Sequence, residues 1–331
     1  MLNEHAHISG KIFTDTIERA PTRDGFGTGV VEAGKHDDRI IVLCADLKES
    51  TRADQFEKEF PDRFVEVGIA EQNMAALASG MAAAGKIPFI ASYAAFNPGR
   101  NYEHIRTTIA LNRMPVKVCG MHAGVSVGPD GATHQMLEDI GLMRMLPNMT
   151  VIAPADAEEA RKAVAAAATT DTPVYLRFGR SKTPTFTTGK TPFEIGKALM
   201  LWESEKPHIA ILSTGALTYQ ALAAARSLAA EGIETLVLHV PTVKPLDREA
   251  IIAAAKRAGR VVTLEEHQAA GGFGSAVAEL LAQEHPVSMK IIGVADQFGQ
   301  SGTPDELLAH YGLDVFSVVA TVRAFLNTER G

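Results

Sequence analysis

The sequence predicts an α/β protein of two domains, each with a mainly parallel sheet flanked by helices. Its 331 residues are about twice the usual length of one domain. Short β-rich runs alternate with Ala-rich stretches almost from end to end, as expected for parallel βαβ units. A segment with Thr-rich turns and no apolar period interrupts the alternation after residue 180. We therefore expect a first domain over 1–185, a linker over 186–196 and a second domain over 197–331.

The elements of the first domain follow from apolar runs and their spacing. Strands are expected over 39–46, 87–93, 116–121, 150–153 and 174–178. Helices are expected over 69–85, 100–113, 134–145 and 156–168. In the first of these helices, Met74, Leu77, Ala78 and Met81 recur with helical spacing, and Gly85 is placed to end it.

The second domain repeats the alternation. Strands are expected over 208–215, 234–240, 260–266 and 289–294, with helices over 218–231, 247–257 and 274–284. In such sheets, ligands gather at the carboxyl ends of the strands, so polar residues that follow strands are the candidates for a site.

Composition excludes several classes of function. The 32 Lys and Arg against 39 Asp and Glu give a net charge of −7, which argues against nucleic acid or an anionic membrane as the main partner. No apolar run reaches about 18 residues, and the first ten residues contain no apolar signal region, so we expect neither a membrane span nor secretion. Cys44 and Cys119 each lie in an apolar run, which favours buried thiols and a cytoplasmic location.

Two glycine-rich patterns in the sequence resemble known motifs only weakly. Gly124-Val-Ser126-Val-Gly128 has the spacing of a nucleophile elbow, but Pro129 and Gly131 follow where a helix must begin at once. Gly271-Gly-Phe-Gly partly matches a dinucleotide-binding fingerprint, but it lies late in the chain with no matching first βαβ unit. We interpret the first as a Gly-rich loop and the second as close strand-to-helix packing.

A polar constellation is more informative than either motif. His122, Asp130 and His134 fall in one Gly-rich stretch that follows a strand and ends where a helix is expected, with Thr133 as its N-cap. Proton transfer and hydroxyl recognition suit these side chains, while a metal site or simple loop capping are the alternatives. Glu71 stands at another helix start, directly after a strand. It either stabilises the helix dipole at the surface or is buried beside a heteroaromatic nitrogen.

Several stretches of the chain together resemble transketolase and its relative deoxyxylulose-phosphate synthase. In the first domain these are VGIAEQN, SYAAFNPGRNYEHIRTT and GVSVGPDGATHQMLEDIGLMR. In the second they are VTLEEHQAAGGFGSAVAELL and FGQSGTPDELLAHYGL. The resemblance covers nearly the whole chain. It implies a pyrimidine-binding domain that holds half of thiamine diphosphate, followed by a transketolase C-terminal domain.

The resemblance also assigns cofactor-binding residues. Glu71 matches the glutamate that hydrogen-bonds the pyrimidine ring nitrogen and favours the imino tautomer. Phe96 and Tyr102 match aromatic residues packed around that ring, and Leu47 matches a bulky residue near the bent cofactor. Gly99 stands where transketolase has a second stacking aromatic, so Arg100 is the candidate to cover that face by cation–π stacking.

The sugar site follows in the same way. His122, Asp130 and His134 match residues that hold the substrate hydroxyls and relay protons, so Glu71, His122 and His134 are the expected catalytic residues. A second set matches positions that grip a sugar phosphate: Arg23, Ser50 and Arg177. Paired guanidinium groups suit phosphate recognition.

The resemblance further implies a partner. Thiamine enzymes hold the diphosphate through Mg²⁺ or Ca²⁺ with a Gly-Asp-Gly motif, which this chain lacks, and a full transketolase is about twice as long. We therefore expect no metal ligand on this chain and a separate N-terminal-half subunit that completes the site, with a self-dimer and an α2β2 assembly. The alternatives are the β subunit of a 2-oxo acid dehydrogenase, a synthase-like half, a serine hydrolase that uses Ser126, and a non-catalytic paralogue.

Overall fold

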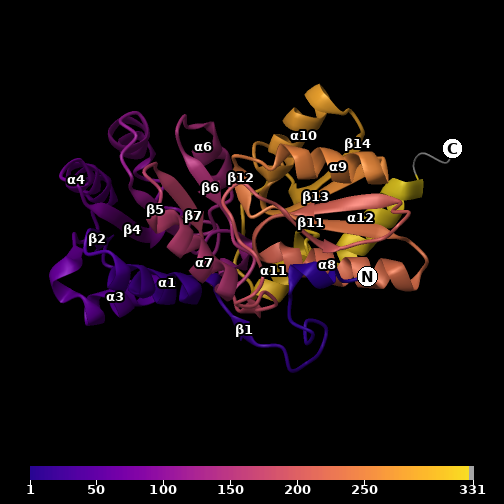
Figure 1. The fold of residues 1–331 in the computed structure, drawn as a ribbon, viewed down its shortest axis with the longest axis horizontal. Helices are drawn as coiled ribbons and strands as arrows, with labels where there is room; N and C mark the ends of the chain where they lie inside the picture. The colour runs from indigo at the N-terminus through magenta and orange to yellow at the C-terminus, as the bar shows by residue number, and fades with distance from the viewer. Residues whose placement is uncertain (328–331) are drawn as a thin grey trace.

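The computed structural model describes residues 1–327, and its two domains lie side by side, each with a central sheet between helices (Figure 1). The first sheet has seven strands in the order β12-β6-β7-β5-β4-β2-β3, all parallel except β12, which runs antiparallel to β6. Its strands are β2 (Ile40–Cys44), β3 (Phe64–Glu66), β4 (Ile87–Tyr93), β5 (Lys117–Met121), β6 (Thr150–Ile152), β7 (Val174–Arg177) and β12 (Thr242–Lys244). This architecture confirms the α/β prediction.

Helices cover both faces of the first sheet. On one face α1 (Thr22–His36) packs along α7 (Ala157–Ala168), and apolar side chains such as Phe26 and Val164 fill the space above the strands. The other face carries α4 (Glu71–Ala83), the π-helical segment η3 (Ile105–Ala110) and α6 (Asp139–Met145). Short elements connect these layers: α2 (Lys48–Thr51), α3 (Asp54–Glu59), η2 (Pro61–Arg63), α5 (Tyr102–His104) and η4 (Val125–Val127).

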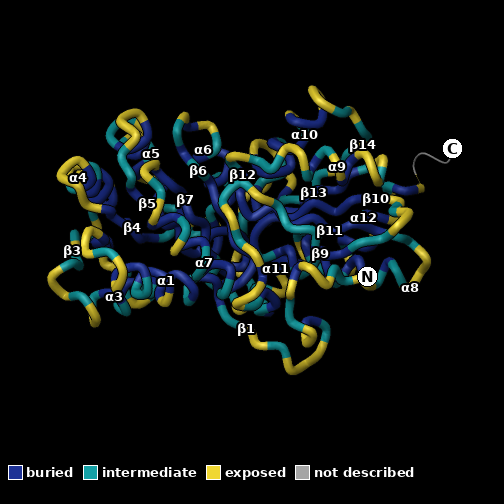
Figure 2. Tube along the Cα trace, in the orientation of Figure 1, coloured by how far each residue is buried: buried dark blue, intermediate teal, exposed yellow. Residues whose placement is uncertain are grey.

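The second sheet has five strands in the order β14-β13-β10-β11-β9, with β9 antiparallel to β11. They are β9 (Leu199–Trp202), β10 (Ile209–Ser213), β11 (Thr235–His239), β13 (Arg260–Gln268) and β14 (Ser288–Val294). Its helices are η5 (Gly215–Leu217), α8 (Thr218–Ala230), α9 (Arg248–Ala258), α10 (Phe273–Glu284), α11 (Pro304–His310) and α12 (Val315–Asn327). Figure 2 shows that the central strands of both sheets are buried, whereas the edge strands β3 and β14 are largely half-buried or exposed.

Each domain contributes a segment that packs against the other. The first 17 residues, which we assigned to the first domain, lie against the second sheet: the Asn3 amide donates to the Leu201 carbonyl at 2.9 Å, and Ile12 is buried in the second domain's core. The expected linker is preceded by β8 (Thr183–Pro184), which pairs with β1 (Arg19–Ala20). Conversely, β12 lies within the sequence of the second domain but pairs with β6 at the edge of the first sheet. The two domains therefore share structural elements in both directions.

One predicted helix is shorter than expected. The helix expected over 134–145 begins only at Asp139, so Thr133 is not its N-cap. The reason is the buried amide of Gln135, which donates to the carbonyls of Val125 and Gly128 and holds the residues before Asp139 in a turn. The helix expected over 69–85 is confirmed as α4, with Met74 and Ala78 in the core.

By length and composition alone, one helical stretch, Pro304–Asn327, could cross a membrane. A turn separates it into α11 and α12. Several of its apolar side chains, among them Leu307, Val318 and Val322, are buried in the core of the second domain, whereas Phe316 is exposed. Packing within this domain therefore accounts for part of its apolar composition.

Candidate active site

Most of the predicted site residues meet at the carboxyl edge of the first sheet. Leu47 follows β2, Phe96 follows β4, and His122 follows β5. Arg23 reaches this edge from the first turn of α1, and Glu71 from the first turn of α4. Because parallel strands end at a common edge, residues far apart in the sequence converge there.

Glu71 is buried, with 2% of its surface exposed. Its Oε2 accepts a hydrogen bond from Nη1 of Arg100 at 2.7 Å, and its backbone carbonyl accepts one from the side-chain amide of Asn101. The Arg100 guanidinium also lies over the Phe96 ring, 4.5 Å from its centroid, in a cation–π contact within the chain, while its expected stacking on the pyrimidine ring stays a prediction. Arg100, which is partly exposed, therefore links the buried carboxylate to the Phe96 face and is the only side-chain partner of Glu71 among residues 1–327.

The turn that carries Phe96 and Arg100 explains Gly99. A Cβ atom at this position would lie 2.2 Å from the carbonyl oxygen of Ala95, so no larger residue fits without moving the backbone. The predicted departure from the family pattern is therefore a packing requirement of this turn. Two other predicted cofactor-binding residues are partly buried against the domain core. Tyr102 packs against the core beneath α4 and η3, and Leu47 packs against the core beneath α1.

A group of aromatic rings forms the second part of the site. The Tyr93 ring stacks on His122 with centroids 4.2 Å apart, and both Tyr93 and Phe96 present their faces or edges to His134 at 6.0 and 5.6 Å. Our sequence analysis missed Tyr93. The signal was available, because it is the last residue of β4, at the edge where ligands bind.

His122, one of the two histidines in this group, is neutral. Burial, together with the charges of Arg23 and Arg180, lowers the pKa of His122 to about 3. Nη1 of Arg23 lies 2.7 Å from Nε2 of His122 and 2.8 Å from the Ser50 carbonyl oxygen. Since a guanidinium only donates, Nε2 accepts and the proton sits on Nδ1, which is buried without a hydrogen-bond partner in the described chain. His122 thus carries one buried N–H group that makes no hydrogen bond within the described residues.

A second arginine flanks this site. Nη1 of Arg180 donates to the Val127 carbonyl at 2.7 Å and lies 3.4 Å from Oδ1 of Asp130. Burial lowers the pKa of Arg23, and repulsion from Arg52 and Arg180 contributes to this shift. Arg23 and Arg180 are thus two neighbouring cations, and such a pair of guanidinium groups is suited to an anion.

The structure does not bring Arg177 to this site. Its side chain is 8% exposed, its Nε donates to Oδ2 of Asp139 at 2.7 Å, and its Nη2 donates to the Glu266 carbonyl at 2.8 Å. Sequence analysis chose the arginine inside β7, whereas Arg180, three residues later in the loop, is the one beside Asp130. Ser126 is also placed differently from a nucleophile elbow, in the turn η4 with its amide donating to Glu266.

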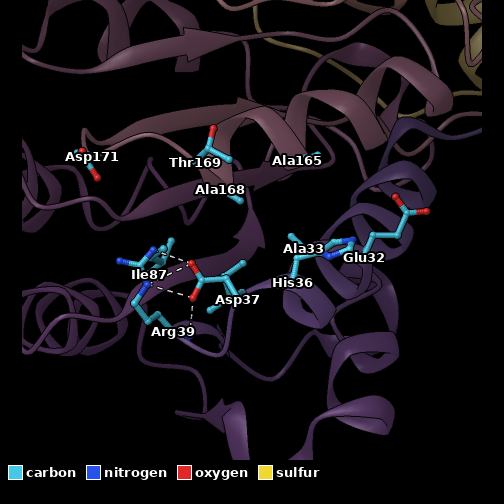
Figure 3. A pocket seen from close by; sticks show the side chains of 11 residues that line it. Glu32, Ala33, His36, Asp37, Arg39, Ile87, Ala165, Ala168, Thr169 and Asp171 are labelled. Carbon is cyan, nitrogen blue, oxygen red and sulfur yellow. Dashed lines mark hydrogen bonds and ion pairs between the residues drawn. The ribbon is translucent and has the colours of Figure 1, made fainter.

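A cavity of about 520 Å³ lies elsewhere, near the amino ends of β2 and β4 (Figure 3). Its apolar floor includes Ala33, Ile40 and Ile87, and the Asp37–Arg39 ion pair lies at its rim. The catalytic candidates stand at the opposite ends of these strands, so this cavity is separate from them. Among residues 1–327, no three His, Cys, Asp or Glu side chains are grouped so that they could hold a metal ion.

Comparison with known proteins gives two family matches. Residues 18–185 match the model described as transketolase, pyrimidine binding domain, and residues 196–318 match transketolase, C-terminal domain. A Methanocaldococcus jannaschii protein assigned as a transketolase C-terminal section is 41% identical over 93% of this chain and 96% of its own length. The 6-deoxy-6-sulfo-D-fructose transketolase subunit of a Clostridium species is 38% identical, over 93% of this chain and 95% of its own length. A solved split-gene transketolase, an inactive β4 tetramer, superposes with a TM-score of 0.86 at 44% identity, covering 92% of this chain and 98% of that one.

Proposed function

Since the chain belongs to the transketolase family, we propose that it is the C-terminal-half subunit of a thiamine-diphosphate-dependent transketolase. In this role it helps to transfer a two-carbon ketol unit from a ketose phosphate to an aldose phosphate. The observation that carries the proposal is the buried Glu71 carboxylate beside Phe96, next to an anion-binding edge formed by Arg23 and Arg180.

The residues around Glu71 fit an aminopyrimidine ring. The ring needs a flat apolar surface and an acceptor or donor for its nitrogen, and Phe96 and the Glu71 carboxyl group supply these. When bound, thiamine diphosphate supplies a nucleophilic carbon that takes up the two-carbon unit. The role of Glu71 is to share a proton with the ring nitrogen, which requires that Arg100 release Oε2. Arg100 is the partner that can move, since 43% of its side chain is exposed, and it must also leave the Phe96 ring. The Glu71 carboxyl group is only 2% exposed, so the ring nitrogen must replace Arg100 as its partner.

The sugar binds beside this ring. Arg23 and Arg180 hold the anionic end of the ketose, and the Nδ1–H group of His122 donates to a substrate oxygen. Asp130 accepts from a hydroxyl group and His134 moves protons, with the aromatic rings of Tyr93 and Phe96 fixing its position. The sulfonated ketose of the Clostridium relative supports a donor with an anion at this end, since phosphate and sulfonate are both bound by guanidinium groups.

A partner subunit completes the enzyme in this proposal. The chain has no Gly-Asp-Gly motif, so an N-terminal-half subunit holds the diphosphate and its Mg²⁺ or Ca²⁺ ion, and two copies of each chain form an α2β2 assembly. Three apolar side chains before, on and beside the helix that begins at Glu71 are exposed and support an interface: Ile69 at 75%, Leu77 at 37% and Leu111, which follows η3, at 71%. The two cysteines are free and buried, which supports a cytoplasmic location.

The test is reconstitution. The chain is co-expressed with its N-terminal-half partner and assayed with xylulose 5-phosphate, ribose 5-phosphate, Mg²⁺ and thiamine diphosphate. We expect ketol transfer by the complex and none by either chain alone. Transfer by this chain unaided, or a complex that is inactive on every ketose phosphate and sulfonate tried, would contradict the proposal.

A further inference from the structure

The loop that carries the sugar-binding residues depends on side chains from the rest of the molecule for its shape. This substrate loop, residues 122–136, contains only the short turn η4 and is closed at its base by the Gly124 amide and the Met136 carbonyl, 2.9 Å apart. His122, Asp130 and His134 all lie on it. Turn hydrogen bonds within the loop, such as that from the His134 amide to the Gly131 carbonyl, shape it locally, and contacts from outside the loop fix it against the rest of the molecule.

The strongest of these contacts comes from the second domain. Glu266, near the end of β13, is 6% exposed, and its Oε1 accepts a hydrogen bond from the Ser126 amide at 2.6 Å. A short hydrogen bond to a buried carboxylate is among the stronger ones in proteins. Gly124 makes room for it, since a Cβ there would lie 2.4 Å from the same oxygen, and its φ of +93° also favours glycine.

A second hydrogen bond joins the same loop to the second domain. The Gln135 amide, besides its bonds to Val125 and Gly128 within the loop, donates to the Gln300 carbonyl at 2.9 Å. The segment that contains Gln300 also lies close to the loop at Gly131, where an added Cβ would come 2.8 Å from Oγ of Ser301. Both contacts use backbone groups of the loop and involve none of the side chains of His122, Asp130 and His134.

We propose that Glu266 is a positioning residue, through which the second domain fixes the substrate loop for the sugar without touching the sugar itself. The proposal rests on the proposed function. It gives the C-terminal domain a role in sugar binding that is distinct from the cofactor half of the site, because Glu71 and Phe96 lie outside the loop that Glu266 holds. Removing Glu266 should affect sugar kinetics and leave cofactor binding unchanged.

The neighbouring residue supplies a matched control. Glu265 is equally buried on the same strand, but its carboxylate accepts from the Phe273 and Gly274 amides, at 2.6 and 2.7 Å, at the start of α10. It supports its own domain and makes no bond to the substrate loop. Glu265→Ala should therefore lower the melting temperature while leaving the loop in place.

The first measurement is hydrogen–deuterium exchange of the peptide containing Ser126, in the chain without its partner. We expect exchange at least about 10-fold faster in Glu266→Ala, the effect of losing one hydrogen bond to a charged group. Glu266→Gln keeps an acceptor oxygen and should restore slow exchange, and Glu265→Ala should match the native chain. If exchange at Ser126 is equally fast in Glu266→Ala and Glu265→Ala, Glu266 does not fix the substrate loop, whatever the activity of the enzyme.

The second measurement uses the complex with the N-terminal-half partner. For Glu266→Ala, kcat/KM for the ketose donor should fall about 10-fold to 100-fold, with the Kd for thiamine diphosphate within about twofold. Glu266→Gln should recover most of kcat/KM. A Glu266→Ala complex with native kcat/KM, or with cofactor affinity lost in step with kcat/KM, would overturn the positioning role. An inactive native complex would instead contradict the proposed function. The exchange measurement would still show whether Glu266 fixes the substrate loop.

Discussion

Arg177→Met distinguishes a structural arginine from one that binds the sugar phosphate. The Arg177 guanidinium and the Asp139 carboxylate are both buried, with Nε and Oδ2 2.7 Å apart, and Asp139 also accepts from the Tyr175 hydroxyl at 2.7 Å. Removing the arginine leaves a buried carboxylate with one neutral donor, which costs about 3–5 kcal/mol for a broken buried pair. At roughly 2 °C per kcal/mol for a chain of this size, the melting temperature should fall by about 6–10 °C.

The assay is thermal unfolding of the isolated chain, followed by circular dichroism at pH 7. The double variant Arg177→Met with Asp139→Leu removes both charges, so it should recover most of the loss. In the reconstituted complex, the KM of any Arg177→Met enzyme that folds should stay within about threefold of native, because the proposed function assigns the anion to Arg23 and Arg180. A melting temperature unchanged within about 1 °C, together with a KM raised about 10-fold or more for phosphorylated sugars only, would refute the reasoning.

Three further outcomes follow from the site. Gly99→Ala forces a Cβ against the Ala95 carbonyl, so thiamine diphosphate should bind the complex more weakly by about 1–3 kcal/mol, measured by calorimetric titration; unchanged affinity would show that the turn is not part of the pocket. Asp130→Ala should chiefly impair donors with one hydroxyl configuration, and equal loss for all donors in steady-state assays would count against its role. The folded-state pKa of His122 is lowered to about 3 by burial and by Arg23. Unfolding therefore takes up a proton below about pH 6.5, so stability should fall as pH drops from 6.5 toward 3, and less so in His122→Asn. Urea unfolding at several pH values checks this, and parallel curves for the two chains would contradict it.

Much of the fold could be predicted from the sequence because its signals are local. The apolar run over 39–46 became β2, and the helical period over 69–85 became α4, since both bury their apolar residues in the expected way. The edge strands β9 and β12 escaped prediction. Both are short and antiparallel, and β12 pairs with β6 of the other domain, a contact that no local pattern encodes.

The site residues show the same difference between features set by local sequence and features set by tertiary contacts. Motif resemblance placed Glu71, His122 and Asp130 because each follows a strand within a distinctive stretch, and the structure brings them to one edge of the sheet. It selected the wrong arginine, because Arg177 and Arg180 stand three residues apart and only the fold shows that Asp139 neutralises the first. The contribution of Glu266 could not be predicted at all, since it joins residues 140 positions apart in the chain.

The most direct test of the central claim is the turnover of the reconstituted complex carrying Glu71→Gln. The exposed surface residue Glu249 provides the matched control, Glu249→Gln on α9. If the Glu71 carboxyl group shares a proton with the pyrimidine ring, kcat should fall at least about 100-fold, as expected for a positioned proton-transfer group. Size-exclusion chromatography should show the same assembly for both variants. A Glu71→Gln complex with kcat within about threefold of the control would contradict the account.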